Sequence, residues 1–227
     1  YEMLRSLVGS EMCIRDSNNG LFIGKKNEVY RYNEETANFD LYYQLPNGSL
    51  DIFCMHIDKG YLWIGTTTNG VYRLNIDKKE LEHPIRKGNI ISFYRDSGGE
   101  LWIGSWEEGL FHVKTNGKIE NFKYDAKNPH SLSSNFVRAC CEDNLGNIWI
   151  GTFNGLNRYN KSTGLFQNHT ANDIQSDGLT HSSIWCIVKD NQGTLWLGTY
   201  FGGVNYFNPE YEIYTCLLYT SPSPRDS

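Results

Sequence analysis

The sequence has few of the residue patterns on which most enzyme chemistry depends. It holds 6 cysteines but no CxxC pair, and no histidine and cysteine stand at the spacing of metal ligands. It also lacks a nucleophile elbow and a phosphate-binding loop. We therefore expect no metal site, no cofactor and no catalytic residues in this segment. The 6 histidines occupy unrelated phases of the chain, which argues against a ring of metal ligands.

The chain also lacks a surplus of positive charge. Its formal net charge is −5, with 21 basic and 26 acidic residues. Proteins that bind nucleic acid or anionic membranes usually carry a basic patch or stripe. A mildly acidic composition therefore predicts no contact with nucleic acid by this segment.

Both ends of the chain differ abruptly from its middle. Residues Leu7 to Ser17 match the in-frame translation of a transposase-type sequencing adapter, and Cys216 to Asp226 match the reverse complement of the same adapter. We therefore expect residues 1–17 and 216–227 to be adapter-derived rather than native, and we exclude them from functional reasoning. The lack of a signal peptide or membrane segment then carries no information.

A four-residue motif dominates the remaining sequence. Leu-Trp-Ile-Gly or a close variant ends at Gly65, Gly104, Gly151 and Gly198, and a weaker copy with phenylalanine ends at Gly24. These glycines are spaced 39 to 47 residues apart. A period of this length is typical of the four-stranded blades of a β-propeller.

The residues around the motif predict the other strands of each blade. An Asp-x-x-Gly turn precedes the motif at Asp96, Asp143 and Asp190, with a contracted version at Asp58. These aspartates are more readily explained as turn formers than as calcium ligands. Six residues before each turn aspartate stands a branched aliphatic residue, and four residues before it stands a small one. Since both positions have the same parity, we expect them to share one face of the innermost strand.

The fold class is therefore all-β, a propeller fragment of about four complete four-stranded blades plus a partial first blade. We expect the following blade boundaries: 18–45 for the partial blade 1, 46–87 for blade 2, 88–128 for blade 3, 129–174 for blade 4 and 175–215 for blade 5.

The repeated tryptophans and glycines are expected to be structural, since a residue common to every blade is explained by packing between blades. This set comprises Trp63, Gly65, Trp102, Gly104, Trp149, Gly151, Trp196 and Gly198.

Ligand-binding candidates are sought where the blades differ. The loop after the motif varies from blade to blade, and loops on one face of a rigid scaffold often carry binding residues. The candidates are Trp106, Glu107, Glu108, Phe153, Asn154, Tyr200 and Phe201. Aromatic rings beside carboxylates and amides could stack on a sugar and bind its hydroxyl groups. Alternatively, these rings cover gaps between blades.

The blade sequence resembles the two-component regulator propeller family. The resemblance is carried by Asp143 to Asn160, which reads DNLGNIWIGTFNGLNRYN, and by the connector from Tyr124 to Asn135, and it extends over 18–215. It implies a periplasmic sensor in a hybrid two-component histidine kinase of the Bacteroidota type. It also implies that the fragment comes from a propeller of seven blades, with an oligosaccharide ligand, a second propeller in the parent chain and a homodimeric parent.

On this interpretation the segment is not an enzyme, and the kinase core of its parent lies outside it. Two other classes of function stay open. A secreted propeller enzyme of the lyase type would show turnover, and a protein-interaction scaffold would bind no small molecule. Glu107 and Glu108 are adjacent on the chain and diverge in direction, so they do not form an evident acid/base pair.

Overall fold

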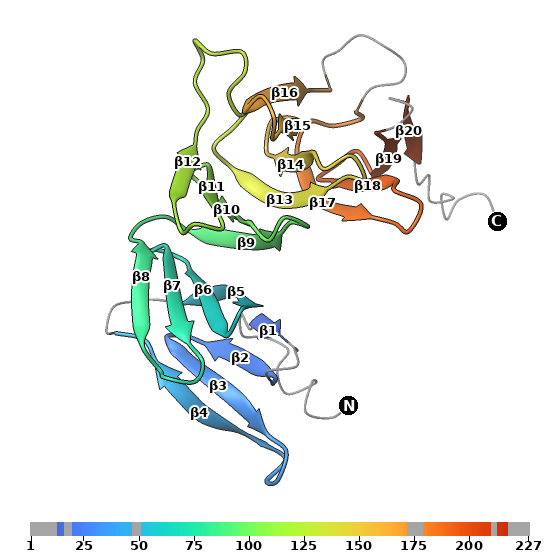
Figure 1. The fold of residues 1–227 in the computed structure, drawn as a ribbon. Helices are drawn as coiled ribbons and strands as arrows, with labels where there is room; N and C mark the ends of the chain where they lie inside the picture. The colour runs from blue at the N-terminus through green and yellow to red at the C-terminus, as the bar shows by residue number, and fades with distance from the viewer. Residues whose placement is uncertain (1–12, 16–19, 47–50, 172–178, 210–212, 218–227) are drawn as a thin grey trace, which may run out of the picture. The chain divides into compact units, whose positions relative to one another are not determined.

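The chain folds into a series of small β-sheets. A computed structural model describes residues 13–15, 20–46, 51–171, 179–209 and 213–217. These residues form five four-stranded antiparallel sheets and no helix (Figure 1). In every sheet, each strand pairs with the strands that precede and follow it in the chain. The predicted fold class, an all-β propeller fragment, is confirmed, and each sheet is called a blade below.

The strands have the following bounds. Blade 1 contains β1 (Cys13–Arg15), β2 (Phe22–Lys25), β3 (Glu28–Asn33) and β4 (Asn38–Gln44). Blade 2 contains β5 (Ile52–Asp58), β6 (Tyr61–Thr66), β7 (Val71–Asn75) and β8 (Leu81–Ile85). Blade 3 contains β9 (Ile90–Arg95), β10 (Leu101–Ser105), β11 (Leu110–Val113) and β12 (Ile119–Phe122). Blade 4 contains β13 (Val137–Glu142), β14 (Ile148–Thr152), β15 (Gly155–Asn160) and β16 (Leu165–His169). Blade 5 contains β17 (Ile184–Lys189), β18 (Leu195–Thr199), β19 (Val204–Asn208) and β20 (Ile213–Leu217).

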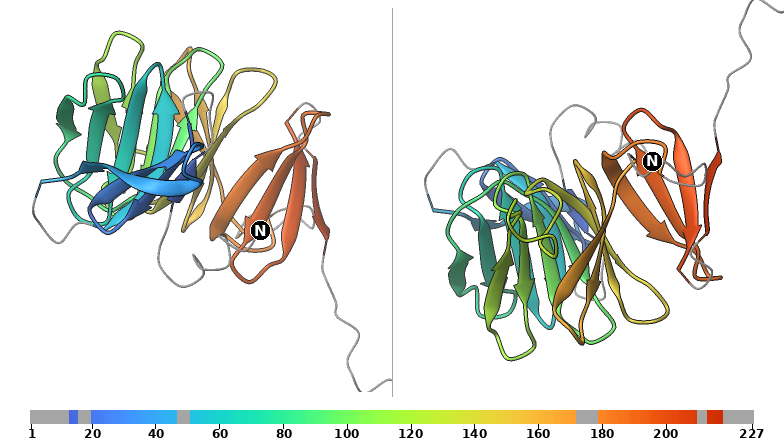
Figure 2. Two further views of the ribbon diagram at one scale, coloured as in Figure 1. Left: turned by 90° about the horizontal axis from the view of Figure 1, so that it is seen from below. Right: turned by 90° about the horizontal axis from the view of Figure 1, so that it is seen from above.

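The chain divides into two compact units. Unit 1 comprises 1–93 with 105–108, and unit 2 comprises 94–104 with 109–227. Blades 1 and 2 belong to unit 1, and blades 4 and 5 belong to unit 2 (Figure 2). In unit 1, β5 packs against β2, and in unit 2, β17 packs against β13 and β14. Within each unit, therefore, consecutive blades contact each other through the inner strand of the later blade.

The inner strands of blades 2, 4 and 5 each contain a β-bulge. The bulges lie between Ile52 and Cys54, between Val137 and Ala139, and between Ile184 and Cys186. A bulge inserts one unpaired residue, so the simple alternation of side chains along the strand is broken. The predicted sharing of one face by the branched and the small residue is therefore wrong. In blade 5, Ile184 is fully buried against blade 4, whereas Cys186 is exposed.

Each unit has its own hydrophobic core. In unit 1, Phe22 and Val29 of blade 1 pack with Ile52, Met55 and other residues of blade 2. In unit 2, one cluster surrounds Trp102. A second cluster joins Trp149 and Leu156 of blade 4 to residues of blade 5. The cores therefore lie between blades, as expected for a repeat that buries its faces by stacking.

Two strands include residues that the sequence assigns to the adapter. β1 pairs with β2, and β20, which extends to Leu217, pairs with β19. Extended chain of almost any origin can pair with an open sheet edge, because the edge presents free backbone donors and acceptors. Pairing at these positions therefore does not bear on where the residues come from. The other residues assigned to the adapter lie outside the described part of the chain.

Candidate functional site

The repeated tryptophan is fixed by the turn that precedes it. In blade 4 the Oδ2 atom of Asp143 accepts a hydrogen bond of 2.7 Å from Nε1 of Trp149, while its Oδ1 accepts from the backbone of Leu145 and Asn147. The same tryptophan-to-aspartate bond joins Trp102 to Asp96 and Trp196 to Asp190, at 2.9 Å each. One carboxylate therefore holds both the turn and the indole.

Three of the repeated tryptophans are buried, and the fourth, Trp196, is partly exposed. Trp102 and Trp149 are 0% and 1% exposed, and Trp63 is 5% exposed. Their indole rings present no accessible face to a ligand. In the described part of the chain, the turn aspartates do not join other histidine, cysteine or acidic side chains in a group that could hold a metal ion.

The threonine after the motif organises the loop that follows it. In blade 4, Thr152 donates from its hydroxyl to the carbonyl of Gly155 and accepts from the backbone of Asn154. Thr199 makes the same two kinds of bond in blade 5, with Gly203 and Gly202. The loop is thereby closed on itself, which limits the directions in which its side chains can point.

The first residue of each loop is then tied to the start of the inner strand. The backbone N–H of Phe153 donates to the carbonyl of Phe136 at 3.0 Å, and that of Tyr200 donates to Ser183 at 3.0 Å. Both carbonyls stand immediately before the branched residue that begins β13 or β17. The variable loop and the beginning of the inner strand therefore lie side by side in blades 4 and 5.

The bulge places one further side chain beside each loop. Arg138 and Trp185 are the residues skipped by the pairing register of β13 and β17. Bulges commonly re-aim a side chain next to a functional site. The Cζ atom of Arg138 lies 4.4 Å from the ring centroid of Trp185 and 5.5 Å from that of Phe153. The guanidinium of blade 4 is thus shared between rings of both blades.

Together these residues form an exposed surface on unit 2, which we call the aromatic–arginine surface. It consists of Arg138, Phe153, Trp185, Tyr200 and Phe201. Its four rings are 53% to 80% exposed. The ring centroids of Trp185 and Tyr200 are 5.7 Å apart, and those of Tyr200 and Phe201 are 4.4 Å apart. An exposed set of large rings of this kind is unusual on a protein surface and marks a candidate binding site.

Burial lowers the pKa of Arg138, and the nearby Tyr200 acts in the opposite direction. The guanidinium nevertheless keeps its charge under physiological conditions. Its Nη1 atom donates to the hydroxyl of Ser183 at 3.1 Å, which holds the group across the two blades. The surface therefore combines ring faces, a fixed cation and the phenol of Tyr200. Such groups can stack on a sugar ring and bind its hydroxyl or carboxylate groups.

The structure brings together four of the predicted ligand residues. Phe153, Tyr200 and Phe201 belong to the aromatic–arginine surface, and Asn154 is exposed in the same loop as Phe153.

The other three predicted residues belong to unit 1. Trp106 is 36% exposed, and its backbone N–H donates to the carbonyl of Asn89. Glu107 is exposed. Glu108 forms an ion pair of 2.8 Å with Lys87. Trp106, Glu107 and Glu108 are thus not part of the surface described for unit 2.

The prediction omitted Arg138 and Trp185, although the sequence contains a signal for them. They stand five residues before the turn aspartate, a position that holds Phe53 in blade 2 and Ile91 in blade 3. The flanking positions are constant in character, while this one changes from blade to blade. It therefore has the same property that singled out the loop residues.

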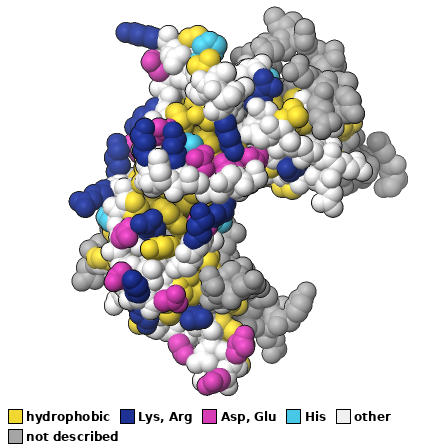
Figure 3. Space-filling model, viewed as in Figure 1, with side chains coloured by type: hydrophobic (Ala, Val, Ile, Leu, Met, Phe, Trp, Pro, Cys, Tyr) yellow, Lys and Arg dark blue, Asp and Glu magenta, His cyan; other side chains and the backbone are white. Residues whose placement is uncertain are grey.

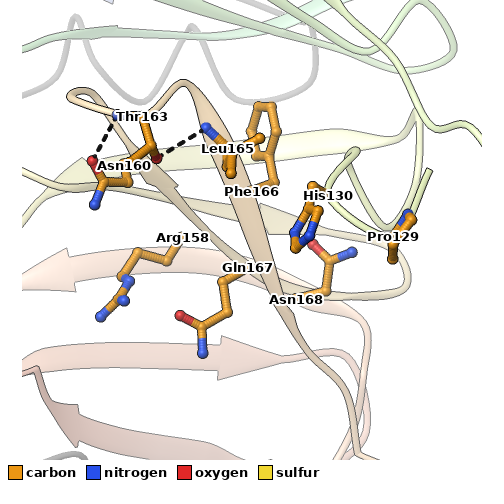
Figure 4. A pocket seen from close by; sticks show the side chains of 9 residues that line it. All are labelled: Pro129, His130, Arg158, Asn160, Thr163, Leu165, Phe166, Gln167 and Asn168. Carbon is orange, nitrogen blue, oxygen red and sulfur yellow. Dashed lines mark hydrogen bonds between the residues drawn. The ribbon is translucent and has the colours of Figure 1, made fainter.

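A depression lies on the outer strands of blade 4. It measures about 500 Å³ and is lined by Pro129, His130, Arg158, Asn160, Thr163, Leu165, Phe166, Gln167 and Asn168 (Figure 4). Several polar groups of its lining bond to one another or to the backbone, as Asn160 does with Thr163 and Asn168 does with Ser131. The depression is open, and the ring of Phe166 in its lining is only 3% exposed, whereas the aromatic–arginine surface exposes four large rings beside a cation and is the stronger candidate.

Charges on the face drawn in Figure 3 are mixed, with basic and acidic side chains lying next to one another and to hydrophobic ones. This face presents no field of a single sign. The described residues also include no helix long and apolar enough to cross a membrane.

Parts of the chain match a known family of repeats. A family model described as "Two component regulator propeller" matches residues 84–107, 131–154 and 178–201. Each matched segment contains an inner strand, its turn, the tryptophan strand and the beginning of the variable loop. These three segments match the two-component regulator propeller repeat. Among curated proteins, no sequence matches it.

Solved structures resemble these repeats over nearly the whole chain. The extracellular domain of the hybrid two-component system BT3049 from Bacteroides thetaiotaomicron is 25% identical, with a TM-score of 0.71, and the match covers 96% of this chain and 30% of that one. PorZ, a surface component of the type-IX secretion system of Porphyromonas gingivalis, is 12% identical with a TM-score of 0.69, over 94% of this chain and 34% of PorZ.

A protein of unknown function from B. thetaiotaomicron is 14% identical, with a TM-score of 0.54, over 90% of this chain and 58% of that one. The chain thus spans about a third of the length of the BT3049 extracellular domain and of PorZ. The likenesses to PorZ and to the protein of unknown function concern the fold alone.

Proposed function

We propose that this chain is part of the extracytoplasmic ligand-sensing propeller of a hybrid two-component regulator. Two observations support the proposal. The repeats match the family model in three segments, and the likeness to the extracellular domain of BT3049 extends over 96% of the chain. In such a regulator this segment binds a signal on the periplasmic side, while phosphoryl transfer takes place in a kinase core elsewhere in the parent protein.

The aromatic–arginine surface is the binding site in this proposal, and its ligand is an oligosaccharide. The main support for this site is the position of Arg138, whose Cζ atom lies 4.4 Å from the ring centroid of the exposed Trp185. Sugar rings present C–H groups that stack on an indole, and their hydroxyl or carboxylate oxygens accept hydrogen bonds from a guanidinium. Tyr200 and Phe201 extend the stacking surface, so that more than one sugar residue can be bound.

Signalling requires that the ligand bind one arrangement of the regulator more tightly than another. The difference in binding free energy between the two arrangements then shifts the population of the active kinase. A second propeller of the parent chain and a partner protomer supply the two arrangements. The segment described here contributes the contact with the ligand.

Titration with oligosaccharides tests the binding site. We propose to measure binding of neutral probes, xylohexaose and maltohexaose, and of an acidic probe, trigalacturonate, by calorimetry and tryptophan fluorescence. For a probe that binds, Trp185→Ala and Arg138→Met should each weaken binding about tenfold or more, since central aromatic and arginine residues dominate such interfaces.

Tyr124→Ala is the matched control, since Tyr124 is 51% exposed in unit 2 but lies outside the surface. It should leave binding unchanged. If every variant binds as the parent does, the aromatic–arginine surface is not the site. Release of an unsaturated sugar product during the titration would instead support the lyase-type enzyme. Failure of all three probes to bind would support the interaction scaffold.

A further inference from the structure

The third strand of each blade carries, opposite the repeated tryptophan, a residue that differs from blade to blade. It is Arg73 in blade 2 and Arg158 in blade 4. The outer strand then places one residue opposite each arginine, which is Glu82 in blade 2 and Gln167 in blade 4. Blades 2 and 4 therefore carry the same cation beside different partners.

Blade 2 compensates its cation within the blade. The Nε and Nη2 atoms of Arg73 donate to Oε2 of Glu82 at 3.1 and 2.5 Å, and Cζ of Arg73 lies 4.7 Å from the ring centroid of Tyr61. Blade 3 also has a glutamate at the outer position, Glu120, which pairs with Lys114 at 2.9 Å. In both blades, the charged residue at the outer position is thus part of an ion pair.

Blade 4 has no acid at the outer position. Gln167 is a neutral amide, so it cannot compensate the charge of Arg158. Among the residues that the structure describes, the guanidinium of Arg158 forms no ion pair and no hydrogen bond. A guanidinium keeps its charge at physiological pH and carries five N–H donors in a planar fork. Blade 4 therefore presents an unpaired cation where blade 2 has an ion pair.

This cation lies in the depression on the outer strands of blade 4. Figure 4 shows the side chains of Arg158 and Gln167 extending in the same direction from neighbouring strands. The depression measures about 500 Å³. Sites for small molecules commonly have volumes of about 300–1,000 Å³, so this one can hold a ligand the size of a monosaccharide.

Both ends of the depression are fixed by hydrogen bonds. At one end, Oδ1 of Asn160 accepts from the backbone of Thr163 at 3.2 Å and closes the turn before β16. At the other end, the backbone N–H of Phe166 donates to the carbonyl of His130 at 3.2 Å, which holds the connector beside β16. Walls that are ordered before a ligand arrives reduce the entropy lost on binding.

The lining offers groups for three parts of a ligand. The fork of Arg158 matches a carboxylate, which accepts two parallel hydrogen bonds from it. The amide of Gln167 and the imidazole of His130 can each bond a hydroxyl group. In the part of the chain that the structure describes, nothing bonds to the ring nitrogens of His130. Leu165, which is 47% exposed, provides an apolar patch for carbon atoms.

We propose that this depression is a second binding site, which takes a small hydroxylated carboxylate and holds its carboxylate group on Arg158. The site shares no residue with the aromatic–arginine surface. Its ligand can therefore bind whether or not that surface binds an oligosaccharide.

Calorimetric titration with three probes tests the class of ligand. The chain should bind D-glucuronate, and it should bind D-glucose about tenfold or more weakly, because glucose has a similar ring without the charge. Inorganic phosphate should also bind more weakly than glucuronate, since it cannot use the apolar patch. Equal binding of phosphate and glucuronate would show that a bare oxyanion is sufficient, and it would overturn the assignment of a hydroxylated carboxylate.

The sharpest variant is Gln167→Glu, which gives blade 4 the acid that pairs with Arg73 in blade 2. It should weaken glucuronate binding about tenfold or more, because the new carboxylate competes for Arg158. Gln167→Met removes the amide without adding a charge and should weaken binding less. Arg158→Met should weaken binding as much as Gln167→Glu. Circular dichroism and thermal melts check that each variant is folded.

Arg73→Met is the matched control, since it removes the cation at the same position of blade 2. It should leave glucuronate binding unchanged. Absence of glucuronate binding at millimolar concentration would overturn the proposal. So would binding that persists unchanged in both Gln167→Glu and Arg158→Met. Binding that is lost in Arg138→Met and kept in Arg158→Met would place the carboxylate on the aromatic–arginine surface, and the second site would be wrong.

Discussion

Blades 4 and 5 have the same motif, the same turn and the same bulge, yet their tryptophans have different surroundings. Trp149 is 1% exposed because blade 5 covers it, whereas Trp196 of blade 5 is partly exposed. Both indoles donate to their turn aspartates. The motif therefore builds the blade and prepares one face for burial, but the neighbouring blade supplies the burial. In repeat proteins of this kind, much of the stability lies in the interfaces between units.

The largest expected effect comes from removing the tryptophan of each blade. Trp149→Ala should lower the free energy of unfolding by about 3–5 kcal/mol, the usual range for a buried aromatic residue. Trp196→Ala should cost clearly less, about 1–2 kcal/mol, because part of its ring already faces solvent. Urea unfolding followed by circular dichroism measures both changes. Equal losses would show that blade 5 does not provide the burial of Trp149.

A methyl group added at the motif glycine of each blade sharpens the comparison between blades 4 and 5. Gly151→Ala should destabilise the protein by about 1–3 kcal/mol, since the new methyl group meets a branched side chain in a packed interface. Gly198→Ala should cost less, because it meets only a thiol that can rotate. Thermal unfolding of the two variants checks the order. A larger loss for Gly198→Ala would contradict the closer packing of Gly151, which faces Ile184 of blade 5.

The pH dependence of stability probes polar contacts that differ between the blades. Lys161 of blade 4 pairs with Asp96 at 2.9 Å and with Glu142 at 2.8 Å. Burial opposes the charged form of both carboxyl groups, but hydrogen bonds from Trp102 to Asp96 and from Lys161 to Glu142 lower their pKa values overall. Between blades 4 and 5, Lys189 donates a hydrogen bond of 3.2 Å to Asn144, which carries no charge.

A carboxyl group whose pKa is lowered by folding stabilises the protein above its unfolded pKa and loses that contribution as the pH falls through the folded value. Stability should therefore fall as the pH drops below about 4, where these carboxyl groups begin to take up protons. Asp96→Asn should flatten this decline, whereas Lys189→Met should leave its slope unchanged. Thermal melts between pH 3 and pH 6 measure the slopes. An identical decline in Asp96→Asn would exclude that carboxyl group as its source.

The sequence predicts the blades well because the same motif recurs in every blade, so each copy supports the others. The motif copies that end at Gly65, Gly104, Gly151 and Gly198 lie within β6, β10, β14 and β18. Outer strands such as β12 (Ile119–Phe122) carry no repeated motif, so the repeat does not give their bounds.

The candidate site was predicted only in part. The variable loops identify Phe153, Tyr200 and Phe201, because side chains that change from blade to blade stand out against a constant frame. Arg138 and Trp185 were not predicted, since regular alternation along a strand does not indicate a bulge. A bulge depends on how two strands pair, and that information is absent from the periodicity of one strand.

The central claim is that the repeated tryptophans form interfaces between blades, while the variable positions stay at the surface. The six tryptophans make 19F NMR of protein labelled with 5-fluorotryptophan a direct test. On exchange from H2O to D2O, the resonance of Trp185 should shift most and that of Trp196 less, and those of Trp102 and Trp149 should not move. A shift of Trp149 as large as that of Trp196, or a solvent-insensitive Trp185, would contradict the account.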